Sequence, residues 1–185
     1  TVAFSLTRIV GGFLAAFVSA VLLALAARRW RAVEDALAPA VTALKSVPIV
    51  CIIVLLLMWV GSRSVSGIAV FLAVFPAVYF SALEGLADVS PQVGEMLRVF
   101  GVRGFRGFCA YTWPELLPFL LGTSRNVCGM AWKAGVAAEL IGSPMGSVGE
   151  RIYQSKILLE TADLFAWTIV VVLVSWACEQ VFVAL

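Results

Sequence analysis

The sequence predicts an all-α protein that crosses a membrane. Of its 185 residues, 62% are hydrophobic and only 13% are charged, whereas a soluble domain carries about 25% charged residues. The apolar residues form long runs, each close to the length that a helix needs to cross a bilayer. The charged residues stand mainly between these runs. We expect five spans in a single domain over residues 1–185, because no Ser- or Pro-rich linker divides the chain.

The first span is expected over about residues 6–27. Ile9 to Ala27 is free of charge over 19 residues, which gives about 28 Å of helix at 1.5 Å per residue. Three arginines end the run: Arg28, Arg29 and Arg31. Residues 28–45 are then expected to form a loop.

The second and third spans, about 46–62 and 64–83, are expected to form a tight hairpin. Pro48 falls in the first turn of the second span, where proline is tolerated. Only Gly61 to Ser64 is left to turn the chain. Pro76 is expected to kink the third span.

The fourth span, about 112–134, is unusual because it carries Arg125 and Lys133. The fifth is expected over about 164–185. Between them, residues 141–150 are rich in Gly and Pro, which prevents a regular helix. We expect a loop on the outer side there, followed by a short surface helix over 148–159.

Five spans place the two ends of the chain on opposite sides of the membrane. The 28–45 and 84–111 loops share one side and hold seven basic residues, against four on the other side. Because cytoplasmic loops carry the excess of Lys and Arg, the N-terminus is expected outside and the C-terminus in the cytoplasm.

Several function classes are excluded by composition. Histidine is absent, which removes Ser-His-Asp catalysis and histidine metal sites. The four cysteines are widely spaced, so no metal site or catalytic residue is expected. No P-loop motif is present, so this chain cannot hydrolyse ATP by itself. A net charge of +2 is too small to indicate a nucleic-acid partner.

A polar segment that carries arginines, Glu95 to Pro114, separates the third and fourth spans. Its start is amphipathic, with apolar residues at i, i+3, i+4 and i+7: Val93, Met96, Leu97 and Phe100. Gly101 follows, where a helix would end or turn sharply. On these residues alone, a helix that lies on the lipid surface is an equally good interpretation.

The spacing of Glu95, Gly101 and Pro114 resembles the EAA loop of bacterial ABC importer permeases. That loop has Glu-Ala-Ala, then Gly, then nine residues, then Ile-x-Leu-Pro; here Met96 and Leu97 replace the two alanines, and Tyr111 and Trp113 replace the isoleucine and leucine. Further segments resemble the nitrate/sulfonate/taurine branch in order and spacing: Leu44–Pro48, Trp59–Gly61, Leu117–Pro118, Gly122, Arg125, Gly129, Ala131–Trp132, Ala137–Glu139 and Thr161–Ala166. The likeness covers nearly the whole chain.

The resemblance implies the five-helix core of the type I ABC importer permease fold, with a cytoplasmic coupling helix over about residues 90–108. That segment would dock on a separate ATPase. The residues implied in coupling are Glu95, Met96, Leu97, Arg98, Val99, Phe100, Gly101, Val102 and Arg103. The chain itself is expected not to be an enzyme and to bind no cofactor, because ATP and Mg would be used by the partner ATPase.

The resemblance also implies the partners and the location. We expect ABC ATPase subunits, an extracytoplasmic solute-binding protein and a second permease copy, most simply in a homodimer. We expect the chain to cross the bacterial cytoplasmic (inner) membrane several times, in contact with lipid.

Five residues are expected at the translocation path or gate: Arg125, Asn126, Trp132, Lys133 and Glu139. A charge inside a span is costly and usually faces a water-filled path or a partner. Structural interpretations remain open. Arg125 could pair with carbonyls or lipid phosphate, Lys133 could reach the outer interface, and Glu139 could anchor the irregular segment that follows it.

A secondary transporter or channel subunit without an ATPase partner is the alternative function. It would also be all-helical with charges in one span, but it would need no cytoplasmic docking helix and often shows an inverted repeat. We see no such repeat. An intramembrane enzyme ranks last, because the spans lack histidine and paired acids.

Overall fold

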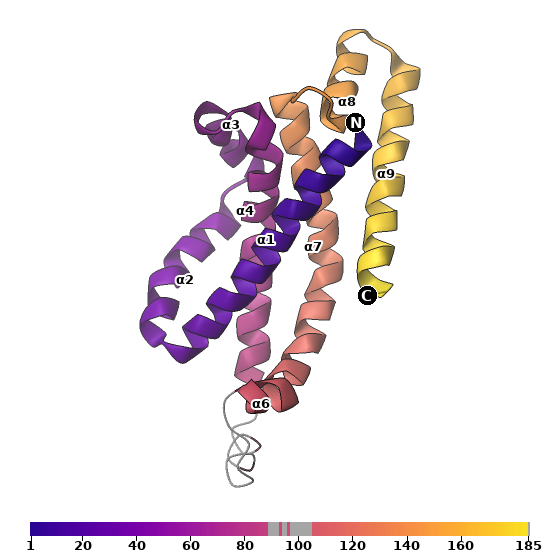
Figure 1. The fold of residues 1–185 in the computed structure, drawn as a ribbon. Coiled ribbons are helices and arrows are strands. Elements are labelled where there is room, and N and C mark those ends of the chain that lie inside the picture. The colour runs from indigo at the N-terminus through magenta and orange to yellow at the C-terminus, as the bar shows by residue number, and fades with distance from the viewer. Residues whose placement is uncertain (89–92, 94–95, 97–104, 185) are drawn as a thin grey trace.

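A computed structural model describes residues 1–88, 93, 96 and 105–184, and all regular elements of the described part are helices (Figure 1). The elements, in order, are α1 (Val2–Arg29), α2 (Arg31–Ser46), α3 (Ile49–Trp59), α4 (Ser62–Asp88), α6 (Phe105–Gly107), the π-helical turn η1 (Phe108–Thr112), α7 (Trp113–Gly142), α8 (Val148–Ile157) and α9 (Thr161–Ala184). The all-α prediction is confirmed.

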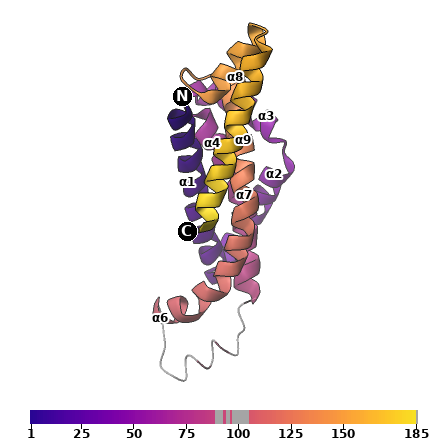
Figure 2. The ribbon, with the colours of Figure 1, turned by 90° about the vertical axis from the view of Figure 1, so that its right-hand side faces the viewer.

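The helices run up and down the long axis of the molecule (Figures 1 and 2). α1 descends, α2 with α3 returns, α4 descends, α7 returns and α9 descends. The N-terminus lies beside α8, and α6 lies at the opposite end. The polar segment Glu95–Pro114 therefore joins the other helices at the α6 end of the molecule.

The expectation of a loop over residues 28–45 is wrong. Those residues form α2, which meets α3 at a bend of 104°. The break falls at Val47 and Pro48, which are extended, with ψ angles of 130° and 126°. Proline disfavours helix at the residue before it and cannot donate its backbone nitrogen. The residues of the second expected span thus fall at this bend and in α3, and Lys45 lies on α2 rather than in a loop.

The described helices that are long and apolar enough to cross a membrane are fewer than the five spans that the sequence predicts. Among the described residues, α1, α4 and α9 are long and apolar enough to cross a membrane, and the bent pair α2 and α3 makes a fourth only if the two helices together form one span. α7 is 30 residues long but carries Arg125 and Lys133. Its place among the other helices, rather than its composition, puts it in the bundle.

The core lies where α4 is held between α1 and α7. Tyr79 of α4, Ile9 of α1 and Leu116 of α7 are all at most 1% exposed. Close approach depends on small residues: a Cβ on Gly12 would meet the Gly67 backbone, and one on Gly135 would meet the Ile9 side chain. Small residues at such crossings are typical of membrane helix packing.

The expected short helix after α7 is confirmed as α8. Ser147 caps it by accepting a hydrogen bond from the backbone nitrogen of Glu150 at 3.0 Å. α9 follows and packs only loosely against the other helices: no residue of its most apolar stretch is buried within the chain. Apolar side chains such as Phe165 and Trp176 are exposed along it. Such a helix is suited to contact lipid.

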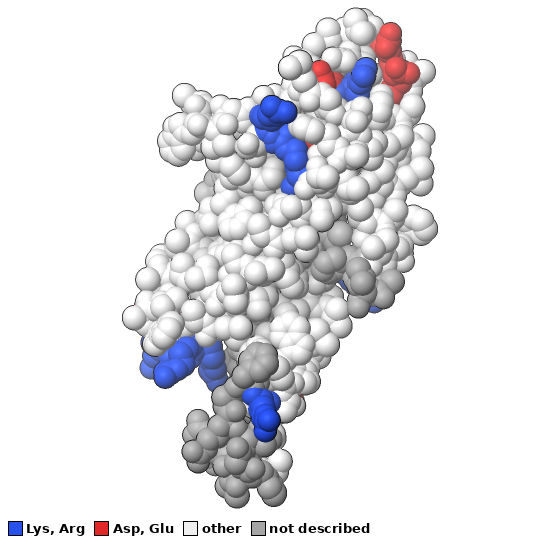
Figure 3. Space-filling model, in the orientation of Figure 1, with Lys and Arg blue, Asp and Glu red and all other residues white. Residues whose placement is uncertain are grey.

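On the face shown in Figure 3, most of the charged residues gather near the two ends of the molecule, with a largely uncharged band between them. Arg28, Arg29 and Arg31 stand at the α1–α2 corner. This distribution matches a protein whose middle is surrounded by hydrocarbon.

Candidate translocation path and coupling segment

Most of the predicted coupling residues lie outside the described part of the chain. Of Glu95, Leu97, Arg98, Val99, Phe100, Gly101, Val102 and Arg103, the structure describes none. Met96 is described: it is helical, and its side chain is 51% exposed. An apolar side chain this exposed is available for a partner or for lipid.

The two helices that flank this segment, α4 and α7, are joined by polar contacts as well as by packing. The Ser81 hydroxyl donates to the backbone oxygen of Phe119 at 3.1 Å. The Thr123 hydroxyl donates to the Ser81 oxygen at 2.6 Å. Nearer the segment, a Cβ on Gly85 would come within 2.9 Å of Leu116 and 3.0 Å of Phe119. The last turns of α4 and the first turns of α7 therefore form one closely packed pair.

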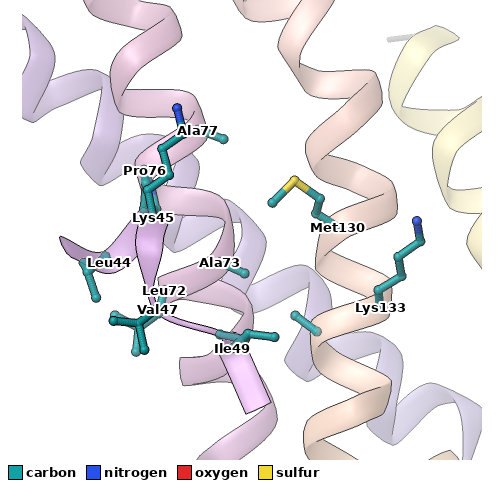
Figure 4. Close-up of a pocket in the computed structure, with 11 residues that line it drawn as sticks. Leu44, Lys45, Val47, Ile49, Leu72, Ala73, Pro76, Ala77, Met130 and Lys133 are labelled. Atoms are coloured by element: carbon teal, nitrogen blue, oxygen red, sulfur yellow. The ribbon is translucent and has the colours of Figure 1, made fainter. Parts of the chain in front are cut away.

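A cavity of about 440 Å³ opens between α2, α3, α4 and α7 (Figure 4). Its lining is mostly apolar, with two lysines: Leu44, Lys45, Val47, Ile49, Leu72, Ala73, Pro76, Ala77, Met130, Lys133 and Ala134. In Figure 4, Met130 extends from α7 toward the α4 side, while the Lys133 side chain extends from the opposite side of α7, away from α4 and Lys45. A volume of this size can hold a small organic molecule.

The structure separates the five predicted path residues into two groups. Arg125, Asn126 and Lys133 are exposed on α7, and Lys133 lines the cavity. Asn126 and Lys133 are seven residues apart, so they share one helix face two turns apart. Trp132 and Glu139 are buried, 4% and 0% exposed. Their assignment to the path stays a prediction that the cavity does not support.

Glu139 instead joins α7 to α1 and α8. Its carboxylate accepts a hydrogen bond from the Ser5 hydroxyl at 2.6 Å and from the backbone nitrogen of Gly149 at 3.4 Å. The Ser5 oxygen in turn accepts from the backbone nitrogen of Val148 at 3.0 Å. These bonds hold the start of α8, in line with the anchoring interpretation of Glu139.

Sequence reasoning missed Lys45 as a cavity residue because it placed residues 28–45 in a loop. A signal was present. Val33, Leu37, Val41 and Leu44 recur at helical spacing, and Val41 is 1% exposed in the structure. The dense charge at residues 28–35 hid this pattern.

Comparison with known proteins identifies the family. Residues 7–184 match the model of the family described as "Binding-protein-dependent transport system inner membrane component". The chain is 31% identical over 133 residues to a putative aliphatic sulfonates transport permease protein of Bacillus subtilis, covering 71% of this chain and 48% of the relative. It is 27% identical over 176 residues to the taurine transport system permease protein of Escherichia coli, covering 95% and 64%.

A third relative carries a different name. The chain is 25% identical over 138 residues to the riboflavin transport system permease protein of Chloroflexus aurantiacus, covering 74% of this chain and 50% of the relative. The chain thus spans about half to two thirds of the length of these relatives. Since the family match covers nearly all of it, the chain belongs to the binding-protein-dependent inner-membrane permeases of ABC transporters, in the nitrate/sulfonate/taurine branch.

Proposed function

We propose that this chain is the membrane subunit of an ATP-driven importer that forms the path for a small solute delivered by an extracytoplasmic binding protein. Separate ATPase subunits would be coupled to it through the Glu95–Pro114 loop. The observation that carries this proposal is the hydrogen-bonded pairing of α4 with α7, at Ser81, Phe119 and Thr123. These are the two helices on either side of the proposed coupling segment.

The pairing supports a mechanical role. When two ATPases close on ATP, a docked segment would be displaced together with the helix ends to which it is connected. Because packed helices move as rigid bodies rather than deforming continuously, the displacement would reach the cavity wall, which both α4 and α7 line. The match to a binding-protein-dependent family favours this over a secondary transporter or channel.

Two copies of the chain are proposed to enclose the path. In one copy, the α7 face that carries Asn126, Met130 and Lys133 is exposed, although two of these residues line or border the cavity. A second copy against this face would close the cavity from the open side. The two copies would be identical in the simplest arrangement.

The proposed orientation places the N-terminus outside and the C-terminus in the cytoplasm. The arginine-rich α1–α2 corner lies toward the same end of the molecule as α6 (Figure 1). The positive-inside rule then makes this the cytoplasmic end, where an ATPase is accessible. α8 and the loop before it would face the binding protein.

The solute is proposed to be a small organic molecule, of the kinds for which the relatives are named: an aliphatic sulfonate, taurine or riboflavin. The chain itself would bind no cofactor, since ATP and Mg belong to the partner ATPase. The size of the cavity is compatible with the smaller of these molecules.

Reconstitution tests the proposal. The tagged chain is purified with its associated proteins, identified by mass spectrometry, and placed in liposomes. We expect an ATPase to copurify, and uptake of taurine or ethanesulfonate to require both ATP on the ATPase side and a binding protein. Uptake that runs on an ion gradient without ATP would contradict the proposal and favour a secondary transporter.

A further inference from the structure

The cavity between α2, α3, α4 and α7 is lined by most of the lysine residues in the chain. The sequence has only three lysines, Lys45, Lys133 and Lys156. Two of them, Lys45 and Lys133, line this cavity, and none of the acidic residues that the structure describes lines it. They come from different helices and are 88 positions apart in the sequence, so only the fold brings them to one site.

The cavity lies at the depth of the hydrocarbon. The α4 residues that line the cavity are centred on the helix, because Ala73 is 11 residues from Ser62 and Ala77 is 11 residues from Asp88. Each distance corresponds to roughly 16 Å of helix. The cavity is thus near the middle of a span that would fill a hydrocarbon core about 30 Å thick.

Neither lysine has a compensating carboxylate within the described residues. Lys45 instead contacts an aromatic ring, since its Nζ lies 5.5 Å from the centroid of Phe80. An unpaired ammonium group at this depth carries a high free-energy cost. Water in the cavity and an anionic ligand would offset that cost.

We propose that Lys45 and Lys133 form an anion site within the membrane that holds the negatively charged group of the solute during its passage. Each ammonium offers three hydrogen-bond donors to an oxyanion such as a sulfonate or carboxylate. The apolar lining, with Leu72 and Met130, contacts the carbon part of the same molecule. The Lys133 ammonium points away from Lys45 in this structure (Figure 4), and its flexible stem must turn back around α7 toward Lys45 when an anion is present.

This inference rests on the proposed function, and its test does not depend on ATP-driven uptake. Ala77 lines the same cavity and is changed to Cys in a background in which the four natural cysteines are replaced by Ser: Cys51, Cys109, Cys128 and Cys178. In native membranes, this thiol is reacted with two methanethiosulfonates of similar size, one ending in a sulfonate and one in a trimethylammonium group. Two nearby positive charges attract the first reagent and repel the second.

We expect the sulfonate reagent to react about tenfold faster or more, and the preference to disappear in Lys45→Met with Lys133→Met. The control Lys156→Met changes the third lysine, which is exposed on α8, and leaves the preference intact. Ethanesulfonate in excess should slow the reaction only while both cavity lysines are present. Equal rates for the two reagents, no reaction with either, or a preference that survives the double change would overturn the anion site. Those results would leave the ATP-dependent uptake assay, and with it the proposed function, to be judged separately.

Discussion

Glu139 shows how one buried residue organises the α8 end of the molecule. Its side chain is fully buried, and one carboxylate oxygen accepts from both the Ser5 hydroxyl and the Gly149 backbone. The other carboxylate oxygen, Oε1, has no partner among the described residues. A buried carboxylate that is only partly satisfied is held in place by surrounding structure, which here includes the close approach of Gly149.

Gly149→Ala should destabilise the protein. A Cβ at this position would meet the backbone and Cβ of Glu139, so α8 must move away from α7. We expect the free energy of unfolding to fall by about 1–3 kcal/mol, as for other over-packed sites. Thermal unfolding in detergent measures this. The control Gly122→Ala, where a Cβ meets nothing within 4 Å, should change stability by no more than about 1 kcal/mol. Equal stability of both variants would show that α8 is not closely held.

Lys133→Met should weaken the response to solute without removing uptake. Lys133 is exposed and lines the cavity, and the loss of one charged hydrogen-bond donor raises the solute concentration for half-maximal uptake by about tenfold. Uptake is measured over a range of taurine or ethanesulfonate concentrations, with Lys156→Met as the control. Unchanged concentration dependence and maximal rate would make Lys133 an interfacial anchor only.

At the scale of an element, the break between α2 and α3 has the largest consequence. An unbroken helix would continue straight, but Pro48 and the extended Val47 turn the chain through 104°. The end of α2 therefore stops beside the middle of α4, with Lys45 near the Phe80 ring. A helix that ends inside a bundle is tolerated where its free backbone groups line a cavity, and this break lines one.

The coupling segment is the second element with a testable role. Gly101→Val should leave the protein in the membrane but uncouple it, because a bulky β-branched residue cannot adopt the turn that glycine allows. Gly101 lies outside the described residues, so this prediction rests on the family spacing and the sequence.

We would test Gly101→Val by membrane fractionation, copurification of the ATPase and solute uptake. Gly122→Ala is the glycine control. We expect normal membrane levels, less copurified ATPase and uptake reduced by at least tenfold, an estimate that corresponds to a loss of about 1.4 kcal/mol in coupling. Normal uptake by Gly101→Val would argue against a docking role for this turn.

At the scale of the whole molecule, two exposed faces of one copy differ in polarity and are suited to different surroundings. α9 exposes apolar side chains along its length, as a helix in lipid does. The α7 face with Asn126, Met130 and Lys133 is also exposed but mixes polar and charged groups with apolar ones. Such a face is costly against lipid and is better covered by protein or water.

A complex with two copies of this chain is therefore expected. Native mass spectrometry of the purified, active complex should give two permease chains with two ATPase chains. Cross-linking through Met130→Cys, in the background without natural cysteines, should join two copies, whereas Phe165→Cys on the exposed face of α9 should not. An active complex with a single permease chain would contradict the expectation.

Much of this protein was accessible from its sequence. Long uncharged runs require helices in a membrane, because only helices satisfy their own backbone there. The positions of α1, α4, α8 and α9 follow from such runs and from the Gly and Pro residues between them. The family was also recognisable, because Glu95, Gly101 and Pro114 stand at a spacing that resembles its loop.

The sequence by itself thus determined most of the helices and the class, since these depend on local pattern, and the coupling segment stays a prediction from its spacing. Only the tertiary structure decided which side chains share a site. It brought Lys45 to the cavity that Lys133 lines, and Ser5 to Glu139 across 134 positions. The reason is physical: hydropathy reports whether a residue avoids water, but the partner of a buried or mid-membrane polar group is chosen by how helices from distant parts of the chain pack.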